Sequence, residues 1–398
     1  MKNRAILTCL GVILLARSVS ASPGLTYHLT PIGPPGSVAY AINENRQIAG
    51  VSNQLAPFAI HSFVVQPDLS LVDLLTLGGT ETYAYDINDL GQVVGWSSLS
   101  TEPNPRYHAF RANGTQPLTS TNDLGTLGGN LSVARGINNR GEVVGQSETS
   151  GHEFHAFRTR PNQPLDPTTD DLGTFGGGTS HATAINNAGQ VVGGAEAPDN
   201  TVRAFRTLPN APLNAATDDL GRLFGFTNSF ASDINSAGEV VGSSYTSPAT
   251  IVRSFRTGPN QMIDPTSSDL GTLGAGSDTA ALSINDFGWV VGWATTNGEF
   301  GEHAFVHDGV GIIDLNDHLD SSGAGWTLLE AQDINNAGQI VGFGLLDVGS
   351  GNSDIQAFVL DLIAVPEPSS ATLAIFAAMA AAAGCHWRGR LLRAGKGK

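Results

Sequence analysis

The sequence predicts an all-β protein, a β-propeller of seven blades, from three observations. Gly contributes 49 of the 398 residues and charged residues only 14%, which suits a chain with many tight turns, since Gly adopts positive φ at little steric cost. A unit of roughly 49 residues recurs seven times. Each unit carries the same motifs in the same order. This repeat length is that of a four-stranded propeller blade.

The first motif, Ile-Asn-x-x-Gly-x-Val-Val-Gly, predicts a hairpin. The Asn side chain closes an Asx turn, and the Gly three residues later takes the left-handed conformation of a bulged loop. One strand ends at the Ile, as in 83–87, and the next contains the two Val residues, as in 92–96, whose adjacency indicates burial on both faces. The motif starts at Ile42 (in a degenerate form), Ile87, Ile137, Ile185, Ile234, Ile284 and Ile334.

Two further motifs predict the third and fourth strands of each blade. A His-Ala-Phe-like triplet follows the hairpin and ends at Phe63, Phe110, Phe157, Phe205, Phe255, Phe305 or Phe358. Asp-Leu-Gly-Thr-Leu-Gly-Gly or a relative comes next, at Asp73, Asp123, Asp171, Asp219 and Asp269, with degenerate copies at Asp314 and Asp361. Segments 27–33 and 359–363 both resemble this fourth strand, so one end of the chain can complete a blade begun by the other. The sequence leaves the phase of this closure open.

We favour a closed ring over an open solenoid because a ring protects its strand edges, whereas a solenoid needs capping units that this sequence does not display. Together the three motifs resemble the HAF family of extracellular repeats, over roughly 29–362. The resemblance implies an extracellular repeat protein. It implies no particular reaction, so it assigns no functional residues.

The N-terminal residues 1–21 predict a signal peptide. Lys2 and Arg4 precede an apolar run, 5–16, and Val19-Ser20-Ala21 offers small residues for cleavage. About 12 apolar residues are too few to span some 30 Å of hydrocarbon. We therefore expect cleavage and a mature chain that begins near Ser22.

The C-terminal residues 365–393 resemble a PEP-CTERM sorting signal. Pro366, Glu367 and Pro368 precede an Ala-rich apolar segment, 371–387, and a basic tail that runs to residue 398. The resemblance implies recognition by an exosortase at the inner membrane, and it is associated with bacteria that produce exopolysaccharide. The apolar segment reaches only ~25 Å as a helix, which favours a transient sorting helix. Whether the helix is removed or retained stays open.

Charge and composition exclude several function classes for the body of the chain, residues 22–364. The body has 12 basic and 35 acidic residues, so nucleic acid is not an expected partner. Both ends of the chain are basic, in agreement with flanks held inside the cell. All three Lys and both Cys lie in the ends. The body therefore has no Lys for Schiff-base chemistry and no Cys for thiol catalysis or disulfides.

The residues that recur in the motifs offer few candidates for a binding site. The turn Asn residues are assigned a structural role: Asn88, Asn138, Asn186, Asn235, Asn285 and Asn335. Trp96 and Trp293 follow Val-Val-Gly in two units and are candidate sugar-stacking residues, because Trp is rigid and amphipathic. Packing between blades is the alternative, since the same slot holds Gln146, Gly194, Ser243 and Phe343.

No catalytic constellation is recognisable. The His of the triplet, as in His108, is replaced by Arg or Gln in other units, so it is not expected to be a base or a metal ligand. We expect no cofactor, with one exception left open. The acidic residues Asp170, Asp171, Asp218, Asp219, Asp269 and Asp278 are candidates for calcium binding, and a solvated acidic loop is the alternative.

These observations predict an exported, non-catalytic protein of the cell surface or extracellular matrix that binds or organises exopolysaccharide or another envelope component. One alternative is an extracellular propeller glycan hydrolase or lyase, which requires carboxylates from different blades to converge on the central channel. Another is a structural adhesin that uses its acidic surface with calcium.

Overall fold

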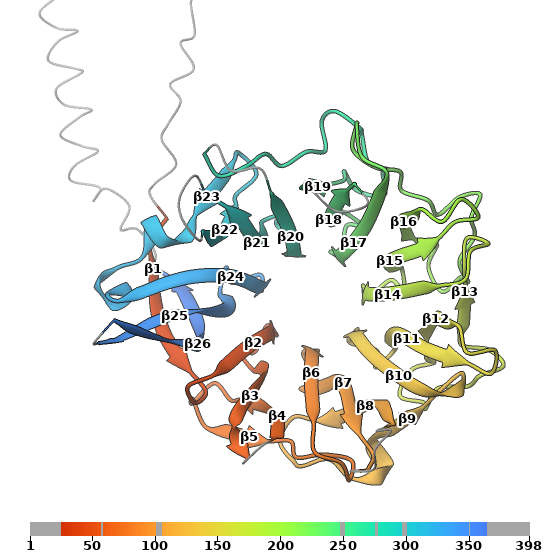
Figure 1. Ribbon diagram of the computed structural model, residues 1–398, viewed down its shortest axis with the longest axis horizontal. Helices are drawn as coiled ribbons and strands as arrows, with labels where there is room; N and C mark the ends of the chain where they lie inside the picture. The colour runs from red at the N-terminus through yellow and green to blue at the C-terminus, as the bar shows by residue number, and fades with distance from the viewer. Residues whose placement is uncertain are drawn as a thin grey trace, which may run out of the picture. The chain divides into compact units, whose positions relative to one another are not determined.

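The computed structural model describes residues 25–363, except 57–58, 101–105, 247–250, 275–277, 297–300 and 350. In this part of the chain seven antiparallel sheets surround a central axis, which confirms the predicted seven-bladed propeller (Figure 1). The propeller forms one compact unit, Tyr27–Leu362. The predicted signal peptide, the Pro366-Glu367-Pro368 sorting motif and the apolar segment lie outside the described residues. Within them, no helix is long and apolar enough to cross a membrane.

Within blades 1 to 6 the strands follow chain order from the channel outward (Figure 1). Blades 1 to 3 are β2 (Ser37–Ile42), β3 (Ile48–Ala56), β4 (Ala59–Val65) and β5 (Leu71–Asp73); β6 (Thr82–Ile87), β7 (Gln92–Ser98), β8 (Tyr107–Asn113) and β9 (Asp123–Gly125); and β10 (Gly128–Ile137), β11 (Val143–Thr149), β12 (Phe154–Arg158) and β13 (Asp171–Gly173). Blades 4 and 5 are β14 (Ser180–Ile185), β15 (Val191–Glu196) and β16 (Val202–Arg206); and β17 (Asn228–Ile234), β18 (Val240–Tyr245) and β19 (Val252–Arg256).

The last two blades complete the ring. Blade 6 is β20 (Thr279–Ile284), β21 (Val290–Thr295), β22 (Glu302–His307) and β23 (Ile312–Asp314), and blade 7 is β24 (Trp326–Ile334), β25 (Ile340–Gly349), β26 (Asn352–Leu362) and β1 (Tyr27–Ile32). In the part of the chain that the structure describes, three short 3-10 helices lie in the connections: η1 (Ser120–Asn122), η2 (Leu315–His318) and η3 (Ser321–Gly323).

The N-terminal strand closes the ring and settles the phase that the sequence left open. Strand β1 pairs antiparallel with β26, from Tyr27 opposite Leu362 to Ile32 opposite Ala357. The first strand among the described residues is thus the outermost strand of blade 7. Gln356 strengthens this seam because its Nε2 donates to the Ile32 carbonyl at 2.6 Å.

Blades 4 and 5 differ from the prediction because their fourth segment is not a regular strand. It meets the third strand at single bridges, Phe205 with Asp219 and Phe255 with Asp269. The Gly two residues later has φ of 79° at Gly221 and 94° at Gly271, and the equivalent Gly125 and Gly173 have φ of 78° and 79° in the regular strands β9 and β13, so this backbone angle does not account for the difference.

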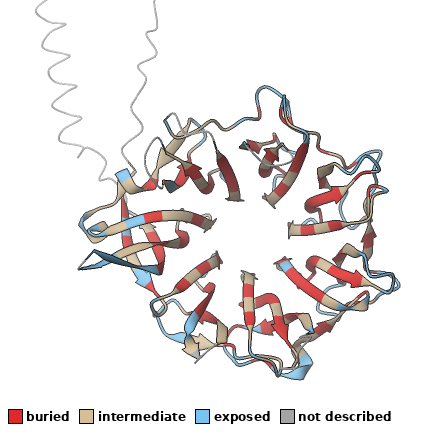
Figure 2. Ribbon diagram, viewed as in Figure 1, coloured by how far each residue is buried: buried red, intermediate tan, exposed pale blue. Residues whose placement is uncertain are grey.

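The repeated apolar residues form the core between neighbouring blades. The seven triplet Phe residues are fully buried, as are adjacent pairs such as Val93 and Val94. Figure 2 shows that buried residues occur along the strands of every blade. One core cluster joins Val94 of blade 2 with Ile137, Val143 and Phe157 of blade 3. Each blade therefore buries its apolar face against the next, and the packing runs around the ring.

Candidate functional site: the polar mouth of the central channel

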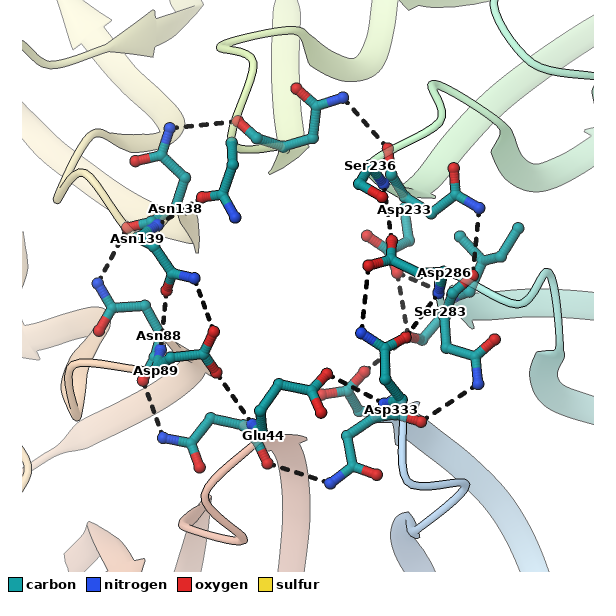
Figure 3. A pocket seen from close by; sticks show the side chains of 18 of the residues that line it. Glu44, Asn88, Asp89, Asn138, Asn139, Asp233, Ser236, Ser283, Asp286 and Asp333 are labelled. Atoms are coloured by element: carbon teal, nitrogen blue, oxygen red, sulfur yellow. Dashed lines mark hydrogen bonds between the residues drawn. The ribbon is translucent and has the colours of Figure 1, made fainter.

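The seven turn Asn residues form a hydrogen-bonded ring at one mouth of the channel, from Asn43 to Asn335 (Figure 3). In blade 2, Asn88 Oδ1 accepts from the backbone N–H of Leu90 and Gln92, which closes the Asx turn. Its Nδ2 donates at 2.9 Å to the carbonyl of Asn138 in blade 3. The cycle closes where Asn335 Nδ2 donates to the Asn43 carbonyl at 3.1 Å.

The residue that follows each Asn lines a cavity of about 240 Å³ at this mouth. Most of these side chains accept from the backbone of the preceding blade, as Asp89 Oδ1 accepts from the Glu44 N–H at 3.0 Å. Glu44 Oε1 in turn accepts from the Asn336 N–H at 3.0 Å. Burial raises the pKa of Glu44, while the Asn336 hydrogen bond opposes the rise. Carboxyl, amide and hydroxyl groups from all seven blades therefore surround one axis.

Three half-buried carboxyl groups line the channel, on the residue before the Ile of the turn motif. Asp86 accepts from the N–H of Ile87 and from that of Ile137 in the next blade, both at 2.7 Å. Asp233 and Asp333 make equivalent bonds from blade 5 to blade 6 and from blade 7 to blade 1. Burial raises the pKa of Asp86 to about 8 and that of Asp333 to about 6. These residues tie blades together.

Ser283 brings two of these carboxyl groups together from different blades. Its Oγ lies 3.0 Å from Asp233 Oδ2 and 2.6 Å from Asp333 Oδ1. A hydroxyl group carries one proton, so one of the two contacts requires a proton on a carboxyl group. Burial raises the pKa of Asp233 as well, which favours that arrangement.

A second cavity of about 250 Å³ adjoins these carboxyl groups. Tyr40, Tyr85 and Arg135 contribute to its lining. The Arg135 guanidinium carbon stands 4.1 Å from the centre of the Tyr85 ring, and the rings of Tyr40 and Tyr85 meet edge to face at 5.4 Å. The channel is therefore polar at the Asn mouth and contains aromatic side chains and a cation in this part.

The structure does not bring the two predicted Trp residues to the channel. Trp96 stacks on Tyr83 at 4.7 Å with an interplanar angle of 16°, so Tyr83 covers one ring face. The slot after Val-Val-Gly faces the next blade, because a Cβ added at Gly194 would overlap the Phe230 ring of blade 5. Trp293 holds the equivalent position in β21 and is half-buried. Neither Trp is among the described residues that line the two channel cavities.

The variable His or Arg of the triplet has a partner that sequence inspection missed. It binds the Asp that opens the fourth segment of the same blade, as in His108 with Asp123 at 2.9 Å and Arg203 with Asp219 at 3.1 Å. The same pair forms at His61, His155, Arg253 and His303. Any side chain that can donate to a carboxylate serves here. In blade 7 the fourth strand is β1, which lacks this Asp, and the slot is Gln356.

The acidic residues considered for calcium have protein partners. Asp170 Oδ2 accepts from the Asp166 N–H and Asp218 Oδ2 from the Asn214 N–H, each at 2.8 Å. Asp278 Oδ1 accepts from the Val252 N–H at 2.9 Å. Across the described ranges there is no group of three or more His, Cys, Asp or Glu side chains that could hold a metal ion. The calcium hypothesis thus finds no ligand set in this part of the chain.

The chain resembles several solved structures, all with low sequence identity and low TM-scores. No protein-family model and no curated protein matches the chain. A proposed gluconolactonase shares 8% identity at a TM-score of 0.39, over 84% of this chain and 92% of that one. A protein of unknown function from Dyadobacter fermentans shares 10% at 0.40, over 86% and 100%. The Aleuria aurantia lectin, in complex with Fucα1-6GlcNAc, shares 13% at 0.31, over 86% and 97%. At this level of similarity the likeness says nothing about activity, and the chain's own sheet order establishes its fold as a seven-bladed β-propeller.

Proposed function

We propose that the protein is an exported, non-catalytic binding protein that holds a neutral extracellular polysaccharide at the polar mouth of its channel. One observation carries the proposal: carboxyl, amide and hydroxyl groups from all seven blades converge on the mouth cavity. Convergent donors and acceptors of this kind suit a polyhydroxylated ligand. The formal net charge of −16 favours a neutral polysaccharide over an acidic one.

The exported location belongs to the same proposal. It is supported by the signal-peptide pattern at residues 1–21, by the PEP-CTERM-like segment at 365–393 and by the resemblance to HAF repeats. The proposed partners are an exosortase during sorting and an exopolysaccharide afterwards. The basic ends of the chain suit a topology in which the body is translocated.

The bonding of the channel carboxyl groups favours binding over catalysis. Both oxygens of Asp86 accept backbone N–H groups, one in its own blade and one in the next. Asp233 and Asp333 are bonded in the same way. A carboxyl group that holds two blades together is poorly placed to move during a reaction.

A second candidate function is glycan hydrolysis or elimination. The convergence of Asp233 and Asp333 on the Ser283 hydroxyl favours it, because two carboxyl groups from different blades meet in one channel. A carboxyl group with a raised pKa suits a general acid, and Asp333, with a pKa of about 6, would take that role.

Binding of the purified full-length protein to an array of neutral and acidic bacterial polysaccharides tests the first proposal. We expect selective binding to neutral polysaccharides and no release of reducing ends. The double variant Glu44→Gln, Asp89→Asn keeps a side-chain oxygen for each backbone donor and removes two charges. It should weaken binding about tenfold, the effect of losing a charge-assisted hydrogen bond.

The matched control for this experiment is Asp68→Asn, which removes a charge on the turn between β4 and β5, where Asp68 bonds only Ser70. It should leave binding unchanged. Absence of binding to every polysaccharide would refute the first proposal. Release of reducing ends that stops in Asp333→Asn would establish the second candidate instead.

A further inference from the structure

One blade breaks the polar pattern of the turns. The residue four positions after the turn Asn is Gln or Glu in six repeats: Gln47, Gln92, Glu142, Gln190, Glu239 and Gln339. Each of these side chains accepts from the Nδ2 of its own turn Asn at 2.6 to 2.9 Å. Blade 6 has Trp289 at this position, which has no acceptor to offer. An aromatic ring thus replaces a polar side chain beside the channel mouth.

The replacement changes the junction between blades 6 and 7. Gln47 of blade 1 holds the position that Trp289 holds in blade 6. A Cβ added at Gly91 of blade 2 would meet the polar end of Gln47 at 3.1 Å. At Gly338 of blade 7 the nearest atoms are apolar: Leu362 Cδ2 at 3.5 Å and Trp289 Cζ3 at 3.8 Å. Trp289 holds the position of Gln47 but gives this junction an apolar floor.

A cleft of about 320 Å³ opens at this junction. Phe287, which is 73% exposed, stands at its rim. Trp289 and Leu362 are half-buried and line it with Phe287. We name these three residues the aromatic cleft. Its volume falls at the lower end of the range for small-ligand pockets, which are mostly apolar with a few polar groups that orient the ligand.

The polar groups that such a ligand needs lie next to the aromatic cleft. Asn285 and Asn336 line both this cleft and the mouth cavity. Asn336 is held in place because its Oδ1 accepts from the Asp286 N–H at 2.8 Å and its Nδ2 donates to Asp286 Oδ2 at 3.2 Å. The two cavities therefore share the residues Asn285 and Asn336, and the Asp286 carboxyl group lies on the side of the mouth cavity.

We propose that the aromatic cleft is the subsite in which one pyranose ring of a neutral polysaccharide stacks, with the adjoining sugar units in the channel mouth. The inference rests on the proposed function and deepens it. A pyranose ring has an apolar C–H face that suits the rigid surface of Trp289 or Phe287. Its hydroxyl groups would meet Asn285, Asn336 and Asp286, and the absence of a cation among these residues suits an uncharged sugar.

The test measures binding of neutral hexasaccharides of glucose, mannose and galactose to the full-length protein by calorimetry. Trp289→Ala and Phe287→Ala should each weaken binding of the preferred hexasaccharide at least tenfold, and Trp289→Phe should retain most of the affinity. Trp293→Phe, in the same blade but outside the cleft lining, is the matched control and should bind as the wild type does. Equal melting temperatures would exclude misfolding, and Phe287, being exposed, keeps the test valid if Trp289→Ala does not fold.

Three outcomes would overturn the inference. Equal affinity of the wild type, Trp289→Ala and Phe287→Ala would show that sugar binds elsewhere, and the proposed function would stand. If the wild type bound neither hexasaccharides nor polysaccharides, the proposed function would fail together with the subsite. If binding appeared only after deletion of residues 364–398, the chain's own segment would be the occupant of the cleft.

Discussion

The half-buried channel carboxyl groups of Asp86, Asp233 and Asp333 predict that the protein loses stability as the pH rises from 6 to 8. Burial raises the pKa of Asp86 to about 8 in the folded protein, whereas an unfolded Asp titrates near 3.9. Between these values the folded state binds one more proton than the unfolded state, so the free energy of unfolding falls as pH rises, by ~1.4 kcal/mol per pH unit for one carboxyl group. The stability that Asp86 contributes is complete below about pH 4 and lost above about pH 8.

Other titratable groups contribute to the pH dependence of stability alongside Asp86. The pKa of Asp333, raised by burial to about 6, adds a second contribution of the same sign between about pH 4 and 6. Burial lowers the pKa of His181 and His307, so these residues act in the opposite direction, below the ordinary His pKa of ~6.5. Burial also raises the pKa of Asp233, so Asp233 contributes with the same sign, and the share of Asp86 is measured as the difference between the wild type and an Asp86 variant.

Chemical denaturation followed by Trp fluorescence at pH 7.0, 7.5 and 8.0 measures this slope. Asp86 alone should contribute a loss of ~1 kcal/mol over this range. Asp86→Asn removes this titrating group and keeps one acceptor for a backbone N–H, so its slope should be shallower than that of the wild type by this amount. Parallel slopes for the wild type and Asp86→Asn would refute the assignment of a raised pKa to Asp86.

Three further predictions concern the motifs of the repeat. Phe157→Ala should lower the free energy of unfolding by ~3–5 kcal/mol because Phe157 is fully buried, whereas Phe224→Ala, at an 83% exposed position, should lower it by almost nothing. Similar melting temperatures for the two variants would contradict the assignment of Phe157 to the core. Gly95→Ala should prevent proper folding, seen as loss of native circular dichroism, because the added Cβ would overlap the Tyr83 carbonyl; a native spectrum would speak against this packing. A double-mutant cycle of Arg203→Gln with Asp219→Asn should give a coupling of at most ~1 kcal/mol, since both side chains are partly exposed, and a clearly larger value would be inconsistent with a surface pair.

The repeat itself was predictable because each blade is a local unit. Each hairpin turn lies within nine consecutive residues, as at Ile87–Gly95, and the burial of the Val pairs follows from their adjacency. The closure phase was not predictable, since 27–33 and 359–363 both resemble the fourth strand. Only the ladder between Tyr27 and Leu362 distinguishes the two possibilities.

The candidate site in the channel could not be predicted, because it is formed by contacts between blades that the sequence of one repeat does not contain. Asn88 was assigned to its turn alone, although its Nδ2 also joins blade 3. Asp86, Asp233 and Asp333 are visible in the sequence as an Asp-Ile-Asn string in three repeats. Their role in joining blades cannot be predicted from that string, because it depends on where the next blade lies. Trp289 interrupts the Gln or Glu series in the same way. Comparing the repeats position by position would have identified both exceptions.

The pairing of β1 with β26 joins the first and the last strands of the described residues. Seven blades cannot close until the final residues of β26, up to Leu362, have left the ribosome. Until then the chain is an open row of blades with unpaired strand edges at both ends, the state in which β proteins are most prone to aggregate. A chain that stops before β26 would therefore remain an open arc. Blade 7 would lack its third strand, and β1 would have no strand to pair with.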